Sequence, residues 1–255
     1  MRPIGTPRRD RGTEPTAPKN RSPASGRKKS RGRGTMNPDD PVVRLCAQGM
    51  QAEAEGRPDA ARDLFHRAWE TADDDYQACI AAHYLARHRP TPEEALHWNR
   101  ECLRRADRVG DERVAGFYAS LHLNMAKAHR DLGEADRARE HFEQAAARLP
   151  EAPPGQYSDW LRYAVADGLR STGAVPPRPG RPALEALTAR LGERGELRAL
   201  ALILPALLGD LGTEEDRVRL AAALHMVHAA RMLPEADQAA LEKALHTLGG
   251  TAAAA

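Results

Sequence analysis

The chain has 255 residues, with 38 Lys and Arg against 36 Asp and Glu, and only three Cys. Three cysteines over this length exclude a scaffold held together by disulfides. The longest apolar run, Ala199 to Leu208, contains a proline and is too short to cross a bilayer. No apolar segment follows the basic N-terminus, so we expect no secretory signal and a soluble, cytoplasmic protein with no membrane partner.

The first 38 residues differ in composition from the rest of the chain. Residues 1–35 hold eleven Lys and Arg, two acidic residues and few apolar side chains, which gives a net charge of +9. Such a segment cannot bury enough apolar surface to offset its chain entropy, so residues 1–38 are predicted to be a disordered basic tail. Met36 offers an alternative translation start that would remove most of this tail.

Three segments share one spacing of apolar and small side chains, i, i+3, i+4, i+7, which places them on one face of a helix. They begin with Ala61, Leu64, Phe65 and Ala68, with Ala95, Trp98, Asn99 and Cys102, and with Ala138, His141, Phe142 and Ala145. A Gly or Pro breaker precedes each segment, and another helical stretch precedes each breaker. The pattern predicts three helix–turn–helix units, with first helices at 41–55, 75–88 and 115–131 and a fourth such helix at 157–171.

These units resemble the tetratricopeptide repeat, a helix pair of 34 residues. That family has two small residues in its second helix, an aromatic side chain between them and often a closing proline. The best match comprises Met125 to Gly133, Ala138, Phe142, Ala145 and Pro150. The first unit keeps Gly49, Gly56, Ala61, Phe65 and Ala68. The second unit departs from the pattern, because Asn99 replaces the aromatic residue and Cys102 the second alanine. The resemblance covers about residues 41–171 and implies a stack of helix pairs.

The resemblance also implies that the first helices line a concave groove for a peptide. The candidate groove residues are Tyr84, Arg87, His88, Asn124, Lys127 and Arg130. Beside them we expect Cys46, Met50, Glu53, Gln77, Ile80, Ser120 and Leu123. The cationic side chains would suit an acidic peptide or a carboxylate, and Asn124 would bond a peptide backbone. The alternative is that these are ordinary exposed side chains.

Residues 172–181 are rich in Pro and Gly and are predicted to be a linker. Four helices are expected after it, at 182–192, 195–210, 213–232 and 235–248. The helix 195–210 is apolar on nearly all faces, which predicts that it is buried and that Pro205 kinks or ends it. One interpretation makes it the centre of a small bundle or of further helix pairs. The other makes residues 195–232 a homo-oligomer or partner interface.

No catalytic spacing is present, neither of a phosphate-binding loop, a nucleophile elbow nor a zinc-protease helix. We therefore expect no enzyme activity, no cofactor and no metal. Cys79 and Cys102 are expected to face the contact between a first and a second helix as small buried hydrophobes. The acidic run Asp73 to Asp75 is expected to be a solvated turn that caps a helix.

The chain is thus predicted to be all-α, with a tetratricopeptide-like superhelix over 39–171, a linker over 172–181, a second small helical bundle over 182–249 and a short disordered tail over 250–255. The predicted function is that of a cytoplasmic, non-enzymatic adaptor that binds a partner protein or peptide in its groove. The alternatives are a nucleic-acid-associated protein that uses the basic arm, and a regulatory helical domain that senses a ligand.

Overall fold

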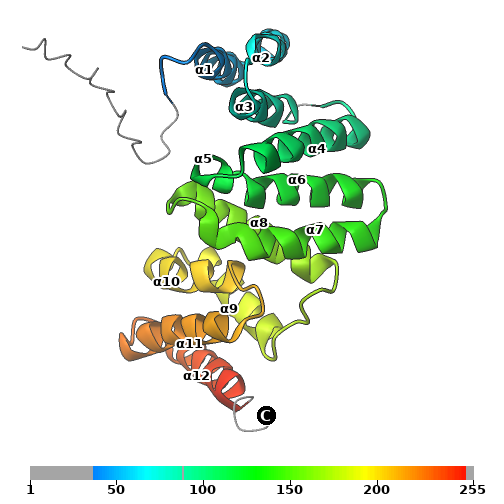
Figure 1. The fold of residues 1–255 in the computed structure, drawn as a ribbon. Helices are drawn as coiled ribbons and strands as arrows, with labels where there is room; N and C mark the ends of the chain where they lie inside the picture. Colours follow the sequence, from blue (N-terminus) through cyan, green and yellow to red (C-terminus); the bar gives the residue numbers. More distant parts are fainter. Residues whose placement is uncertain (1–36, 88, 251–255) are drawn as a thin grey trace, which may run out of the picture. The chain divides into compact units, whose positions relative to one another are not determined.

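The computed structural model describes residues 37–250 apart from residue 88, and for 249 and 250 only the backbone. The predicted tails, 1–38 and 250–255, lie almost wholly outside these residues. Every regular element in the described part is a helix, so the all-α prediction is confirmed (Figure 1). The first helices are α1 (Pro41–Ala54), α2 (Pro58–Thr71), α3 (Asp75–Leu85), α4 (Pro92–Val109), α5 (Glu112–Ala115), α6 (Tyr118–Asp131), α7 (Ala135–Arg148) and α8 (Gln156–Ser171). After them come α9 (Arg181–Glu193), α10 (Leu197–Leu208), α11 (Glu214–Ala229) and α12 (Glu235–Gly250), and a short 3-10 turn, Leu149–Glu151, follows α7.

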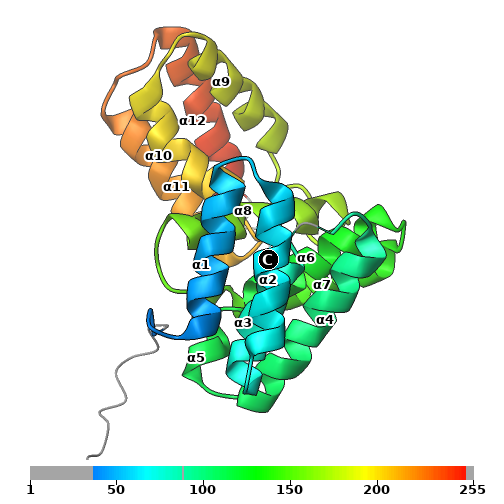
Figure 2. The ribbon, with the colours of Figure 1, turned by 90° about the horizontal axis from the view of Figure 1, so that it is seen from above.

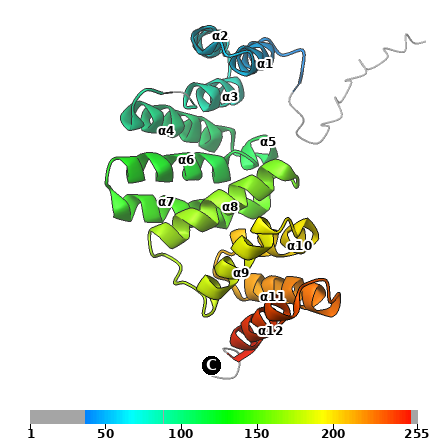
Figure 3. The same cartoon turned by 180° about the vertical axis from the view of Figure 1, so that it is seen from behind.

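Helices α1 to α8 pack mainly against their neighbours along the chain. Contacts join α1 to α2, α2 to α3, α3 to α4, α4 to α6, α6 to α7 and α7 to α8, and Figure 3 shows α4, α6 and α7 as successive layers. One predicted helix is divided in the structure: residues 115–131 contain only the end of α5, and α6 begins at Tyr118. Gly110 ends α4 in a left-handed conformation and Asp111 caps α5, so the chain turns twice before α6.

Capping side chains mark where several helices of this part begin. Asp40 accepts a hydrogen bond from Val42 N at 2.8 Å and begins α1. Asp74 accepts one from Gln77 N at 2.7 Å and begins α3, as expected for the acidic turn. Such caps satisfy N–H groups that have no partner inside the helix. They explain why the sequence predicts most helix starts in this part to within a few residues.

Two phenylalanines fill the contacts between helices in the first and third units. Phe65 of α2 and Phe142 of α7 are each 1% exposed. Each ring lies directly over a glycine of a neighbouring helix. A Cβ added to Gly49 would lie 2.2 Å from the Phe65 ring, and one added to Gly168 would lie 2.0 Å from the Phe142 ring. Only glycine permits these approaches, so aromatic ring and glycine form one packing unit.

Helices α9 to α12 form a four-helix bundle with a core of its own. Contacts join α9 to α10, α10 to α11, α11 to α12 and α12 back to α9, and Figure 2 shows the four gathered together. Their buried side chains are almost all Leu and Ala, with Ile203 and Val227 among them. No aromatic residue occurs after Tyr163, so this core depends on close packing of aliphatic side chains.

The prediction that the helix at 195–210 is buried is only partly correct. In α10, Ala199 and Ile203 are buried, but the Leu197 side chain is 73% exposed and Leu208 is 39% exposed. The helix also continues through Pro205 and ends three residues later, at Leu208. A helix in a four-helix bundle is covered on one side only, so an all-apolar sequence leaves an apolar face in water here.

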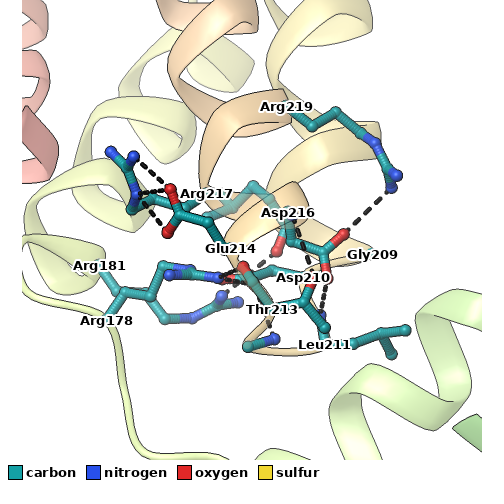
Figure 4. A network of polar contacts seen from close by, with 12 residues as sticks. Arg178, Arg181, Gly209, Asp210, Leu211, Thr213, Glu214, Asp216, Arg217 and Arg219 are labelled. Carbon is teal, nitrogen blue, oxygen red and sulfur yellow. Dashed lines mark hydrogen bonds and ion pairs between the residues drawn. The ribbon is translucent and has the colours of Figure 1, made fainter. Parts of the chain in front are cut away.

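The segment predicted as a linker is tied to the bundle by a buried ion pair (Figure 4). Arg178 binds Asp210 with two nitrogens, at 2.6 and 2.9 Å, and the Asp210 side chain is 4% exposed. From α8, Arg162 forms an ion pair with Asp216 and donates to the Gly209 carbonyl at 2.8 Å. Charged contacts therefore hold the chain between α8 and α9 against the loop that joins α10 to α11. Helix α8 contacts the same loop.

Candidate functional site

A pocket of about 490 Å³ opens between the residues that join α3 to α4, the first half of α4 and the second half of α6. Arg87 and Arg89 come from the connection, Asn99 comes from α4, and Asn124 and Lys127 come from α6. Three of the predicted groove residues, Arg87, Asn124 and Lys127, therefore line one concavity, although they belong to different helix pairs. Such a concave site with a few polar groups is where a ligand is expected.

The pocket lies where the second unit departs from the repeat. In α2 and α7 the residue that follows the small alanine by four positions is a buried phenylalanine, Phe65 or Phe142. The corresponding residue of α4 is Asn99, which is one of the residues that line the pocket. The connection is also longer: six residues join α3 to α4, whereas three join α1 to α2 and three join α6 to α7. Pro90 of this longer connection and Pro92 at the start of α4 line the pocket.

Asn99 places a polar atom without a partner beside this pocket. Its side chain is 1% exposed, and its Nδ2 donates to the Ala95 carbonyl at 2.8 Å. A carbonyl oxygen can only accept, so this bond fixes the orientation of the amide. The other amide atom, Oδ1, is buried and has no hydrogen-bond partner among the described residues. A buried acceptor without a donor costs free energy, and the burial of Oδ1 also keeps it out of reach of a group in the pocket.

Three cations, Arg87, Arg89 and Lys127, line the pocket. Arg87 lies 3.3 Å from a Glu53 oxygen and 5.8 Å from the centre of the Tyr84 ring. Lys127 Nζ lies 4.9 Å from the centre of the Trp160 ring. Burial lowers the pKa of Lys127, and the charge of Arg130 lowers it further. Lys127 forms no ion pair with a described carboxylate, so its charge is available to an acidic ligand.

The remaining predicted groove residues lie at different depths. Tyr84 is half-buried and stacks on Phe65, with ring centres 5.3 Å apart. Arg130 is exposed and does not line the pocket, although its charge reaches Lys127. His88 lies outside the described residues. Arg87 and Lys127 are thus the predicted cations that the pocket brings together.

Four of the side chains expected beside the groove are instead buried in the core. They are Cys46 (2% exposed), Ile80 (1%), Ser120 (3%) and Leu123 (0%). The prediction that they face a ligand is wrong. Helices α1, α3 and α6 each contact more than one other helix, so most of their circumference is covered and only a narrow strip stays exposed.

The sequence did not indicate an aromatic pair on α8 as part of the site. Tyr157 and Trp160 are 56% and 50% exposed, and their rings are stacked with centres 5.9 Å apart. Trp160 also carries Lys127 on its face, so the pair is continuous with one wall of the pocket. Trp160 lies near the start of the fourth first helix predicted from the sequence, 157–171. Its position three residues after Tyr157, on one helical face, was the signal available in the sequence.

Other candidate chemistry is accounted for by packing. Cys79 and Cys102 are both fully buried, with their Sγ atoms 3.5 Å apart at the contact of α3 with α4, which confirms the prediction for them. Among the described residues no three His, Cys, Asp or Glu side chains are grouped so that they could hold a metal ion. No helix in the described part of the chain combines the length and apolar character needed to cross a membrane.

Comparison of the chain with protein-family models, with curated proteins and with solved structures gives no match. The tetratricopeptide resemblance therefore remains a prediction.

Proposed function

We propose that this chain is a cytoplasmic, non-enzymatic adaptor of the tetratricopeptide type, which binds an acidic segment of a partner protein across α3, α6 and α8. The observation that carries the proposal is the pocket that brings Arg87, Asn124 and Lys127 together beside an exposed aromatic pair. Isolated exposed residues would not be expected to converge on one concavity from separate helix pairs.

Each part of the site would contribute a different contact. Lys127 and Arg87 would bind carboxylates of the partner, with Lys127 already held against an aromatic ring and partly removed from water. Asn124 would exchange hydrogen bonds with the partner's backbone. Tyr157 and Trp160 would cover an apolar side chain, because exposed aromatic rings provide large contact area at a small cost in side-chain entropy.

The packing of the helices would make this surface ready before binding. The Phe142 ring against Gly168 fixes α7 on α8, and α6 lies between α4 and α7. A partner would therefore not have to order the groove, which reduces the entropic cost of association.

The proposal is tested by reversing charge in the groove. We expect the double variant Lys127→Glu, Arg130→Glu to lose binding to a fluorescein-labelled peptide of alternating Glu and Asp, measured by fluorescence anisotropy and by calorimetry. Repulsion between like charges would replace attraction at the pocket mouth. The far-ultraviolet circular dichroism should stay unchanged, because Arg130 is exposed and Lys127 is only partly buried.

The matched control is the double variant Arg67→Glu, Arg100→Glu. It changes the net charge by the same amount at two exposed positions of α2 and α4 that do not line the pocket. We expect it to keep peptide affinity within about twofold, since neither side chain lines the pocket and charges at exposed positions are screened by salt. Equal loss of affinity in both double variants would show that net charge, and not the pocket, attracts the peptide.

A further inference from the structure

Helix α10 leaves an apolar strip on the surface of the four-helix bundle. Leu197 is 73% exposed and Leu208 is 39% exposed. Between them Ala201 is exposed and Leu204 is half-buried. These four residues, which we call the α10 seam, follow one another at intervals of four, three and four positions and therefore lie on one face of the helix. No charged residue occurs anywhere from 199 to 209, so nothing on this helix but apolar surface meets the water along the seam.

The parts of the chain outside the described residues do not have the composition to cover this seam. Residues 1–35 contain four apolar side chains among eleven Lys and Arg, and residues 251–255 are one Thr and four Ala. Covering exposed leucines requires large apolar side chains, because the gain in free energy is proportional to the apolar area removed from water. The occupant of the α10 seam is therefore expected on another molecule.

The spacing of the α10 seam fits a second copy of itself. Alternating intervals of four and three residues are those of a coiled coil, in which side chains of one helix insert between those of the other. If two copies of α10 run antiparallel about a twofold axis, Leu197 faces Leu208 of the second copy. Ala201 then faces Leu204 of the second copy, so a small side chain lies opposite a large one. In a parallel pair the two copies of Ala201 would face each other and leave a gap, which close packing disfavours.

The charges beside the α10 seam are complementary in the same antiparallel arrangement. Arg198 is exposed at the N-terminal end of α10 and forms no ion pair with a described carboxylate. Glu215 is 83% exposed in the first turn of α11. This turn lies beside the C-terminal end of α10, because residues 209–213 join the two helices and the helices pack against each other. A twofold axis brings the N-terminal end of one α10 to the C-terminal end of the other, so Arg198 of each copy meets Glu215 of the second.

We propose that a second copy of this chain covers the α10 seam, in an antiparallel twofold dimer in which Arg198 pairs with Glu215 of the second copy. The dimer is independent of the proposed function, because no residue of the α10 seam lines the pocket. The seam extends over roughly 17 Å, at 1.5 Å per residue. Such a contact is small for a protein interface, so we expect a dissociation constant in the micromolar range.

The experiment is sedimentation equilibrium of the full chain, at concentrations from about 2 to about 200 μM, which bracket a micromolar dissociation constant. The wild type should pass from the mass of one chain to the mass of two. Ala201→Glu places a carboxylate at the centre of the seam in both copies, and a charge removed from water without a partner is costly. We expect this variant to raise the dissociation constant by about tenfold or more.

The matched control is Ala239→Glu, the same substitution at an exposed position of α12. Helix α12 packs against α9 and α11 and lies diagonally across the bundle from α10, so this variant should keep the dissociation constant within about twofold. Circular dichroism checks that each variant is folded. Leu197→Glu, at a position that is 73% exposed in the single chain, should also weaken the dimer and serves where Ala201→Glu does not fold.

A charge exchange tests the antiparallel arrangement. Arg198→Glu alone and Glu215→Arg alone should each weaken the dimer by about threefold or more, because each brings like charges together at both ends of the seam. The double variant Arg198→Glu, Glu215→Arg should restore the wild-type dissociation constant, because both intermolecular pairs form again with their signs exchanged.

Each part of the inference has its own contrary result. The mass of one chain at every concentration would refute the dimer. A dimer that Ala201→Glu and Leu197→Glu leave intact, or that Ala239→Glu weakens equally, would refute the α10 seam as its interface. Failure of the double charge variant to restore the dimer would refute the antiparallel arrangement.

Discussion

Replacing Asp216 with alanine should cost more stability than any other single carboxylate replaced in the second half of the chain. Its side chain is 1% exposed and lies at the start of α11. It accepts hydrogen bonds from Leu211 N at 3.0 Å and Thr213 Oγ1 at 2.8 Å. It also forms ion pairs with Arg162 and Arg219. The carboxylate thus joins α8, the loop before α11 and α11 itself.

The magnitude follows from what the substitution leaves behind. Removing one partner of a buried ion pair typically costs about 3–5 kcal/mol, because the remaining charge has lost its compensation. The Arg162 side chain is 26% exposed and recovers part of its hydration. We therefore expect Asp216→Ala to lower the free energy of unfolding by roughly 3 kcal/mol, measured by urea denaturation followed by circular dichroism.

The neighbouring residue provides the control. Glu215 also forms an ion pair with Arg219, but its side chain is 83% exposed. Glu215→Ala should change the free energy of unfolding by less than about 0.5 kcal/mol, as surface ion pairs do. Equal and small effects of the two alanine variants would refute the reasoning, since they would show that the buried network around Asp216 does not join α8 to the bundle.

Two further predictions concern packing and pH. Gly168→Ala should destabilise the chain by about 1–3 kcal/mol, because its Cβ would meet the Phe142 ring at 2.0 Å. Gly192→Ala, whose Cβ would meet nothing within 4 Å, should instead stabilise α9 by up to about 1 kcal/mol. Urea denaturation of the two variants compares these effects. Burial, with neighbouring positive charge, lowers the pKa of both His83 and His122 to about 4. The folded state then binds fewer protons than the unfolded state between about pH 6.5 and pH 4, so the free energy of unfolding should fall as the pH drops through this window, by on the order of 1–3 kcal/mol. A flat stability profile across this window would contradict the burial of these two imidazoles.

Local features of the sequence were enough to place most of the helices. Caps such as Asp74 and Thr91 mark where helices begin, and the repeated spacing around Phe65 and Phe142 marks which face is buried. These signals act within a few residues of one another, so they can be interpreted without knowing the fold. The all-α class follows from them directly.

The depth of individual side chains could not be predicted in the same way. Leu197 is apolar yet exposed, and Ile80 lies on a first helix yet is covered from several sides. Burial depends on how many other elements surround a helix, which is a property of the assembled fold. The spacing pattern of one helix does not contain that information.

The site combines both kinds of information. Arg87, Asn124 and Lys127 could be predicted from the repeat pattern, because each lies on a first helix or just after its end at a position that is exposed or only half-buried. The pocket itself depends on Asn99, which the sequence marks only as a departure from the pattern, and on the length of the connection 86–91. The effect of a residue that departs from the repeat can be seen only in the assembled fold, because it depends on the side chains that surround that residue.

The most direct test of the adaptor account is capture from the native host with three C-terminally tagged forms of the full chain. These are the wild type, the groove variant Lys127→Glu, Arg130→Glu, and the control variant Arg67→Glu, Arg100→Glu. Mass spectrometry of the retained proteins should show a near-stoichiometric partner with the wild type and with the control, and none with the groove variant. The same partners on all three forms, or nucleic acid alone on all three, would contradict the claim that this groove binds a protein.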